Sequence, residues 1–231
     1  MSAHSKKVKS PTIIYRSKEM EHTVEQAAKI AQQDVPVMIY GATGTGKELF
    51  ARLIHDNSNR SQKPFIAVNC AAIPENLIES MMFGTEKGAY TGSEKKKGYI
   101  EMAEGGTLFL DELNSLSIDM QPKLLRYLQD KSYWRLGGDR EHHSNVRVVA
   151  AVNESPALLI KEERLREDLF IVSVWVLSQF QNLKIEKKIS HYLLIISSKN
   201  TKLLLIITSQ ALPKVLKACL KPFIGMVMFA C

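Results

Sequence analysis

The stretch that decides the fold is GATGTGKE, which comprises Gly41, Ala42, Thr43, Gly44, Thr45, Gly46, Lys47 and Glu48. It follows the apolar run VPVMIY, residues 35–40, and opens the helical pattern of residues 47–55. Glycines between a strand and a helix let backbone N–H groups turn inward around phosphate oxygens, and the helix N-terminus adds favourable partial charge. The stretch therefore predicts a phosphate-binding loop in which Lys47 reaches the β- and γ-phosphates of a nucleotide.

A plain glycine turn is the alternative, because Glu48 stands where Ser or Thr usually follows the lysine. A second motif, GGTLFLDE at residues 105–112, is an apolar strand that ends in Asp111 and Glu112. In a nucleotide-binding sheet the first acid holds Mg²⁺ and the second polarises the attacking water. Taken alone, the pair could be a strand end with a helix-capping acid. The two motifs at this spacing together predict an ATP site with Mg²⁺ on Asp111.

Strand-length apolar runs alternate with helical patterns through the first 170 residues. The apolar runs are 35–40, 65–69, 107–110 and 146–152, and the helical patterns are 20–32, 47–55, 75–83, 120–129 and 157–170. Short buried strands that alternate with helices predict an α/β fold, with a central parallel sheet flanked by helices.

A glycine-bracketed segment lies between the two motifs, and its residues are Gly88, Ala89, Tyr90, Thr91, Gly92 and Ser93. Its surroundings are polar, so Tyr90 is expected at the surface. A surface loop rarely leaves an aromatic at its tip without a partner to contact. The segment therefore favours a binding loop over the alternative of an ordinary glycine turn.

This segment resembles the GAFTGA loop of sigma-54-dependent transcription activators, with Tyr90 in place of Phe and Ser93 in place of the last Ala. That loop engages sigma-54 and distinguishes these activators from other AAA+ ATPases. The resemblance covers residues 12–170 and includes PFIAVNCAAIPENLIES, GTLFLDELNSLSIDMQPKLLRYLQD and VRVVAAVN. GTGKE is that family's own form of the phosphate loop, which accounts for Glu48. The resemblance implies an AAA+ P-loop NTPase core.

Three further site residues follow from the resemblance. Asn69 matches the residue that restrains the catalytic glutamate, Glu112. Asn153 matches the first sensor of the γ-phosphate, although Val152 stands where threonine is usual. Arg166 matches the first of two arginines that act on the neighbouring subunit's nucleotide. Without the resemblance, the asparagines would be polar strand-end residues and Arg166 would belong to a helix-surface ion pair.

The implied activity is ATP hydrolysis coupled to remodelling of the closed complex of sigma-54 RNA polymerase. The implied partners are sigma-54 RNA polymerase and further copies of the chain in a homo-oligomeric ring, a hexamer. DNA would be bound through a C-terminal domain that this chain lacks. Another AAA+ machine, such as a chelatase or helicase, is the alternative, and the segment Gly88–Ser93 argues against it.

Composition changes abruptly near residue 170. Residues 1–170 carry 23 basic and 23 acidic side chains, whereas residues 171–231 carry eight lysines against one glutamate. The whole net charge of +7 therefore comes from the tail. After Phe170 the family pattern stops, and Ile171-Val172-Ser173 stands where a Tyr-Arg-Leu run should follow.

Displaced codons recover the missing pattern. Joining the third base of each codon to the first two of the next allows Tyr, Arg and Leu after Phe170, and then a Pro-x-Leu-x-x-Arg-x-x-Asp-Ile stretch. Methionine has one codon, so Met226 and Met228 with their successors must encode Gly and Val in that frame. These two forced residues fit the Gly-Asn-Val of the family's helical lid. The alternative is a genuine divergent tail, with strands in YLLIIS and KLLLIITS.

The sequence thus predicts an N-terminal linker at 1–11, a sigma-54 interaction AAA+ ATPase core at 12–170 and an out-of-frame, non-native tail at 171–231. The chain would lack the second arginine and the lid subdomain, so we expect it to be inactive. A non-enzymatic remnant that binds nucleotide or sigma-54 without turnover is the alternative. MSAHSKKVKSP has no apolar stretch of a signal peptide, and no run approaches the roughly 20 apolar residues of a membrane span. We therefore expect a cytoplasmic protein with no membrane partner.

Overall fold

The computed structural model describes residues 18–172, 175–178, 192–193 and 206–207. The helices are α1 (Lys18–Ala31), α2 (Lys47–Asp56), α3 (Glu75–Phe83), α4 (Tyr99–Met102), α5 (Gln121–Asp130), α6 (Pro156–Lys161) and α7 (Glu167–Val172), with 3-10 turns η1 (Cys70–Ala72) and η2 (Leu113–Ser115). The strands are β1 (Val37–Tyr40), β2 (Phe65–Asn69), β3 (Thr107–Asp111), β4 (Ser132–Trp134), β5 (Glu141–His143), β6 (Arg147–Val152), β7 (Trp175–Ser178), β8 (Tyr192–Leu193) and β9 (Ile206–Ile207). The chain divides into two compact units, 1–185 and 186–231, each described by itself.

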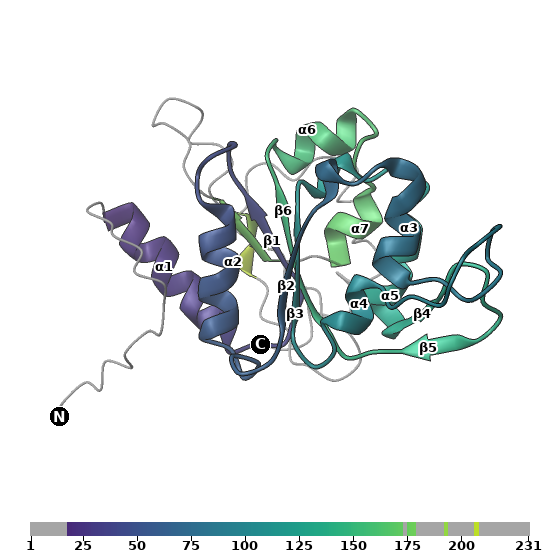
Figure 1. Cartoon of the computed structure of the whole chain (residues 1–231). Coiled ribbons are helices and arrows are strands. Elements are labelled where there is room, and N and C mark those ends of the chain that lie inside the picture. The colour runs from purple at the N-terminus through teal and green to yellow at the C-terminus, as the bar shows by residue number, and fades with distance from the viewer. Residues whose placement is uncertain (1–17, 173–174, 179–191, 194–205, 208–231) are drawn as a thin grey trace, which may run out of the picture. The chain divides into compact units, whose positions relative to one another are not determined.

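A five-stranded sheet forms the centre of the first unit, with the order β2-β3-β6-β1-β7 and every pair parallel. Figure 1 shows α1 and α2 on one face of the sheet and α3, α4, α5 and α7 on the other. β6 is buried at every residue, as expected of a strand whose two faces are both covered. The predicted α/β fold with a parallel sheet between helices is confirmed.

Alternating side chains of the strands divide the core into two layers. Met38 and Leu110 belong to the cluster shared with α3, α5 and α7. Their strand neighbours Ile39 and Phe109 belong to the cluster shared with α1 and α2. Successive strand residues point to opposite faces, so each strand supplies apolar surface to both layers.

Most predicted elements agree with the structure to within two residues at each end, but the single helix expected at 157–170 is wrong. The chain leaves α6 after Lys161, and Glu163 takes a left-handed conformation with φ 57°. Leu159 and Leu165 are both buried in the core. Six residues of helix turn through about 600°, so one continuous helix would place these two leucines on different faces. The break lets both reach the same core.

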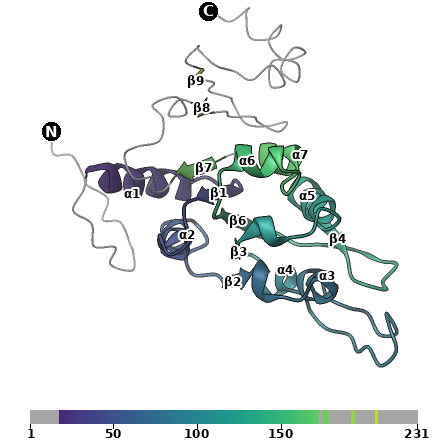
Figure 2. The ribbon, with the colours of Figure 1, turned by 90° about the horizontal axis from the view of Figure 1, so that it is seen from above.

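A β-hairpin of β4 and β5 lies between α5 and β6, where no strand is expected from the sequence. Tyr133 pairs with His142, and their rings stack with centroids 5.5 Å apart. The chain between α3 and α4 meets this hairpin because Thr85 bridges both Lys96 and Leu136. Figure 2 shows the two segments on the side of the sheet away from α1 and α2.

Three short strands of the predicted tail are described, besides the last two residues of α7. Trp175–Ser178, β7, pairs in parallel with β1 and extends the sheet beyond Phe170. In the second unit, β8 and β9 form a two-residue antiparallel pair within the YLLIIS and KLLLIITS runs. The predicted linker 1–11 and the remaining tail lie outside the described residues. None of the described helices is long and apolar enough to cross a bilayer.

Candidate functional site

The glycine-rich loop connects β1 to α2 as predicted. Gly44 and Gly46 have φ near 80°, the left-handed region that glycine adopts without strain. Thr45 closes the turn because both its backbone N–H and its hydroxyl donate to the Ala42 carbonyl oxygen, at 3.3 and 2.8 Å. Gly46 caps α2 without a side-chain hydrogen bond. The loop therefore presents backbone N–H groups at the positive end of a ten-residue helix, which suits an anion.

Lys47 is buried with 6% of its surface exposed. Its Nζ donates to the carbonyl oxygens of Gly41 at 2.9 Å and Ala42 at 3.1 Å, so the ammonium lies against the inside of the loop. A buried ammonium with only neutral carbonyl partners favours an anionic ligand, because burial of an unpaired charge is costly. This position fits contact with phosphate oxygens.

Asp111 is the last residue of β3 and Glu112 follows it, at the edge of the sheet where β1 also ends and the glycine-rich loop begins. The Glu112 N–H donates to Asp111 Oδ1 at 3.0 Å. Glu112 has φ 51° and ψ 49°, a left-handed conformation that costs an L-residue roughly 1–2 kcal/mol. Such strained residues cluster at functional sites. The described residues contain no group of three or more metal-binding side chains, and Mg²⁺ held by one carboxylate and nucleotide phosphates needs none.

The two asparagines lie on strands beside this acid pair. Asn69 is opposite Asp111 in the β2–β3 register, and its Oδ1 accepts from the Ala71 N–H at 2.9 Å. Among the described residues, no hydrogen bond is recorded between Asn69 and Glu112. Asn153 follows β6, and its Oδ1 is buried without a hydrogen-bond partner in the described part of the chain. A buried polar atom without a partner favours a ligand or its bound water.

Parallel strands bring these residues together, because the carboxyl ends of β1, β2, β3 and β6 share one edge of the sheet. Arg166 comes instead from the start of α7. Its guanidinium donates to both carboxylate oxygens of Asp168, at 3.0 and 2.6 Å. The side-chain hydrogen bond from Arg166 lowers the pKa of Asp168. The structure thus shows the surface ion pair that was the plainer alternative for Arg166.

The Gly88–Ser93 segment forms a tight turn between α3 and α4. The Tyr90 side chain is 53% exposed, whereas Ser93 is buried. Ser93 closes the turn, because its N–H donates to the Tyr90 carbonyl oxygen at 2.9 Å and its Oγ accepts from the Tyr90 N–H at 3.1 Å. A Cβ on either Gly88 or Gly92 would meet nothing within 4 Å, so the turn is open on both sides. The turn therefore holds Tyr90 out from the surface.

Charged residues that the sequence analysis does not identify join the base of this turn to the β4–β5 hairpin. Arg135 is buried and donates to Glu86 at 2.6 Å and Glu101 at 2.7 Å. Partial burial raises the pKa of Glu86, but hydrogen bonds from Arg135 and the charge of Lys95 lower it overall. The three residues are separated widely in sequence, so no local pattern indicates the cluster. The hydrogen bonds of Arg135 therefore join the hairpin to the base of the turn.

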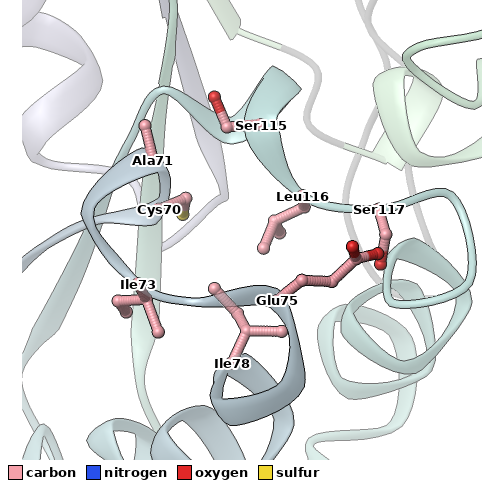
Figure 3. Close-up of a pocket in the computed structure, with 8 residues that line it drawn as sticks. All are labelled: Cys70, Ala71, Ile73, Glu75, Ile78, Ser115, Leu116 and Ser117. Atoms are coloured by element: carbon pink, nitrogen blue, oxygen red, sulfur yellow. The ribbon is translucent and has the colours of Figure 1, made fainter.

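A pocket of about 310 Å³ lies behind the acid pair, lined by Cys70, Ala71, Ile73, Glu75, Ile78, Ser115, Leu116 and Ser117 (Figure 3). Its walls are the start of α3 together with η1 and η2, the turns that follow Asn69 and Glu112. Burial, with the nearby charges of Asp111 and Glu112, raises the pKa of the Cys70 thiol to about 12. The thiol is therefore protonated and unreactive, as expected for a small core residue. No residue of the glycine-rich loop lines this pocket.

The strand order, the glycine-rich loop and the acid pair define a P-loop NTPase fold of the AAA+ class. A solved Hsp104 structure shares this fold at 19% identity and a TM-score of 0.52, over 69% of this chain and 33% of that one. The chain belongs to the family described as the Sigma-54 interaction domain, which it matches over residues 13–177.

Similar proteins are transcriptional activators. The DNA-binding transcriptional activator HyfR of Escherichia coli (strain K12) is 49% identical over 159 residues, which are 68% of this chain and 24% of HyfR. The transcriptional activator RocR of Bacillus subtilis (strain 168) is 46% identical over 159 residues, 69% of this chain and 34% of RocR. The chain thus spans about a quarter of the length of HyfR and about a third of the length of RocR.

Solved structures of NtrX from Brucella abortus are also similar. The complex of NtrX with ATP has a TM-score of 0.66 and 34% identity, over 74% of this chain and 39% of NtrX. The complex of NtrX with ADP has a TM-score of 0.67 and 34% identity, over 72% of this chain and 36% of NtrX.

Proposed function

We propose that residues 12–170 are the ATP-binding core of a sigma-54-dependent activator, which in its intact form couples ATP hydrolysis to remodelling of the closed promoter complex. One observation carries this proposal. The buried Lys47 ammonium, the Asp111–Glu112 pair and Asn153 all lie where neighbouring parallel strands end, and Asn153 Oδ1 has no hydrogen-bond partner within the described part of the chain. NtrX, which is similar over most of this chain, has been solved with ATP and with ADP.

The roles of the residues follow from their positions. Lys47 and the loop N–H groups would hold the phosphates, and Asp111 would hold the Mg²⁺ that neutralises them. Glu112 would orient and deprotonate the attacking water, and Asn69 would restrain Glu112. Asn153 would donate from Nδ2 to the γ-phosphate and accept a hydrogen bond from the attacking water at Oδ1.

Two features relate the site to partners. Arg166 would leave Asp168 and act on the nucleotide of a neighbouring copy, so each site needs a second subunit. Head-to-tail contacts of this kind close into rings, and we propose a homo-oligomeric ring, a hexamer, for the intact activator. Tyr90 would contact sigma-54 in the RNA polymerase, because the turn exposes its ring and the hydrogen bonds of Arg135 hold the base of the turn against the β4–β5 hairpin.

The tail supports a second candidate function for this chain, a remnant that binds nucleotide or sigma-54 without turnover. Val172 stands at the position of the second arginine, and the lysine-rich residues that follow contain no arginine. We propose that residues 171–231 are read out of frame. Two observations extend beyond residue 170, the last residue in frame. β7 pairs with β1 in the sheet, and the family match continues to residue 177. Strand pairing uses backbone groups, so a short apolar run can occupy a sheet edge whatever its ancestry.

Lys47→Ala tests the nucleotide site directly in the 231-residue chain. Loss of the main cationic contact to the phosphates should abolish binding of a fluorescent ATP analogue. Lys29→Ala, at an exposed position of α1, is the matched control and should bind like the parent. Equal affinities of the parent and Lys47→Ala would refute the phosphate-loop assignment.

A further inference from the structure

Gln121 opens α5 and is fully buried, with 0% of its surface exposed. It lies outside the loop, the acid pair and the Tyr90 turn. Its Nε2 donates to the carbonyl oxygens of Leu116 at 3.2 Å and Arg164 at 2.9 Å. Its Oε1 accepts from the Arg166 N–H at 2.9 Å. One carboxamide thus joins three backbone groups.

The partners determine the orientation of this carboxamide. Leu116 and Arg164 offer carbonyl oxygens and Arg166 offers an N–H, so a flipped amide would lose all three hydrogen bonds. Both Nε2 hydrogens are used, and burial excludes water as a substitute. An apolar side chain at this position would leave buried backbone groups without partners, which is costly.

The joined segments belong to different parts of the proposed machinery. Leu116 caps η2, the turn that starts at Glu112, and the Ser115 N–H donates to the Glu112 carbonyl oxygen at 2.8 Å. The Arg166 carbonyl oxygen accepts from the Phe170 N–H at 3.1 Å. The backbone of Arg166 is therefore held at both its N–H and its carbonyl, while 39% of its side chain is exposed.

We propose that Gln121 is a positioning residue, which ties the backbone of Arg166 to the turn that follows Glu112. A nucleotide bound at Asp111–Glu112 would restrict the motion of that turn. Through the hydrogen bonds of Gln121, it would also restrict the backbone of Arg166, the arginine that the subunit presents to its neighbour. The inference rests on the proposed function, because it assumes a nucleotide at this site. It goes further in assigning a link within one subunit between its own site and its arginine.

Amide hydrogen exchange at Arg166 in the 231-residue chain tests this link. A non-hydrolysable ATP analogue should slow exchange of the Arg166 N–H by about fivefold or more, the lower end of typical coupling between sites. Gln121→Met removes all three hydrogen bonds with little change of shape. In this variant the Arg166 N–H should exchange about fivefold faster without the analogue. The analogue should then have no effect on its exchange.

Linkage adds a quantitative condition, because a fivefold slowing of exchange means that the analogue binds the state with the Arg166 N–H protected about fivefold more tightly than the open state. Gln129→Met makes the same change at an exposed position of α5 and should behave like the parent. If Gln121→Met does not fold, Gln121→Glu keeps the acceptor for the Arg166 N–H but, as a carboxylate, has no donor for the carbonyl oxygens of Leu116 and Arg164. It should therefore keep slow exchange and lose the response to the analogue.

The outcomes are distinct. Binding of the analogue without any change at Arg166 in the parent would overturn the inference and leave the ATP site standing. An analogue effect that persists in the Gln121 variants would overturn it as well, since a purely structural glutamine leaves that effect in place. Failure of the parent to bind the analogue would overturn the proposed function and the inference together.

Discussion

Glu112, the catalytic base that we propose, has a strained backbone. Its left-handed conformation, φ 51°, turns the chain sharply after β3 and starts η2. The Glu112 N–H donates to Asp111 Oδ1 at 3.0 Å, so the two acids are also joined by a hydrogen bond at this turn.

Glu112→Gln separates binding from chemistry, in a chain whose reading frame has been restored after Phe170. The amide keeps the size of the side chain but cannot accept a proton from the attacking water. ATP should bind with unchanged affinity while phosphate release falls by about 10² or more, as for loss of a general base. Glu141→Gln, in the hairpin, serves as the control and should hydrolyse ATP normally. Hydrolysis at the parent rate by Glu112→Gln would remove Glu112 from the catalytic role.

The Tyr90 turn exposes an aromatic ring, while the residues at its base are held by hydrogen bonds and close packing. Arg135, Glu86 and Glu101 hold the base, and Gly137 approaches Ala89 so closely that an added Cβ would lie 2.5 Å from the Ala89 Cβ. The hairpin therefore supports the turn from one side.

Tyr90→Ala in the frame-restored chain should leave ATP hydrolysis and the thermal midpoint nearly unchanged, because the ring is largely exposed. Activation of a sigma-54 promoter in a purified transcription assay should be lost. Tyr90→Phe keeps the aromatic face and should retain activation. Normal activation by Tyr90→Ala would show that the turn is not the sigma-54 contact.

A buried histidine makes the junction of α2 and β3 sensitive to pH. His55 Nδ1 lies 2.9 Å from Thr107 Oγ1. Burial lowers the pKa of His55 below its ordinary 6.5, and the charge of Arg52 lowers it further, whereas Asp56 opposes both. The unfolded chain therefore binds a proton that the folded chain excludes. Stability should be fully present above pH 6.5 and fall as the pH drops below it.

Urea unfolding at pH 7.5 and pH 5.5 measures this dependence. His55→Gln should reduce the slope of unfolding free energy with pH, whereas His22→Gln, at an exposed position of α1, should not. Burial lowers the pKa of His142 too, helped by Arg135 and Arg140, so part of the slope should remain in His55→Gln. A parent chain equally stable at both pH values would contradict the prediction.

At the scale of the whole molecule, the 231-residue chain should show negligible ATPase activity and form no stable active ring. An arginine finger is worth roughly 10³–10⁵ in rate, so Arg166 alone should not suffice where Val172 replaces the second arginine. Residues 171–231 should also promote aggregation, because their apolar runs have no selected partner.

Parallel expression of this chain and of a frame-restored version checks both expectations. Gel filtration with light scattering reports the oligomeric state, and phosphate release reports turnover. Soluble, hexameric, ATP-hydrolysing protein from the unrepaired chain would contradict the frameshift proposal.

Local pattern in the sequence is enough to place the glycine-rich loop between β1 and α2, the acid pair after β3, the exposed turn around Tyr90 and most elements of the sheet. These features depend on neighbours a few residues apart, such as glycines where φ is positive and apolar residues at a fixed period. The hairpin at 132–143 was missed because three-residue strands carry too little pattern. The break after α6 was missed because it depends on where two leucines meet the core.

Tertiary structure alone decided which distant polar groups meet. Arg135 reaches Glu86 across 49 residues of sequence, and Gln121 reaches Arg166 across 45. Such pairs form because the sheet and its helices bring remote segments into contact, and each buried polar group must then find a partner. The residue types of the proposed ATP site are therefore visible in the sequence. The way the site is joined to its arginine and its exposed turn followed only from the fold.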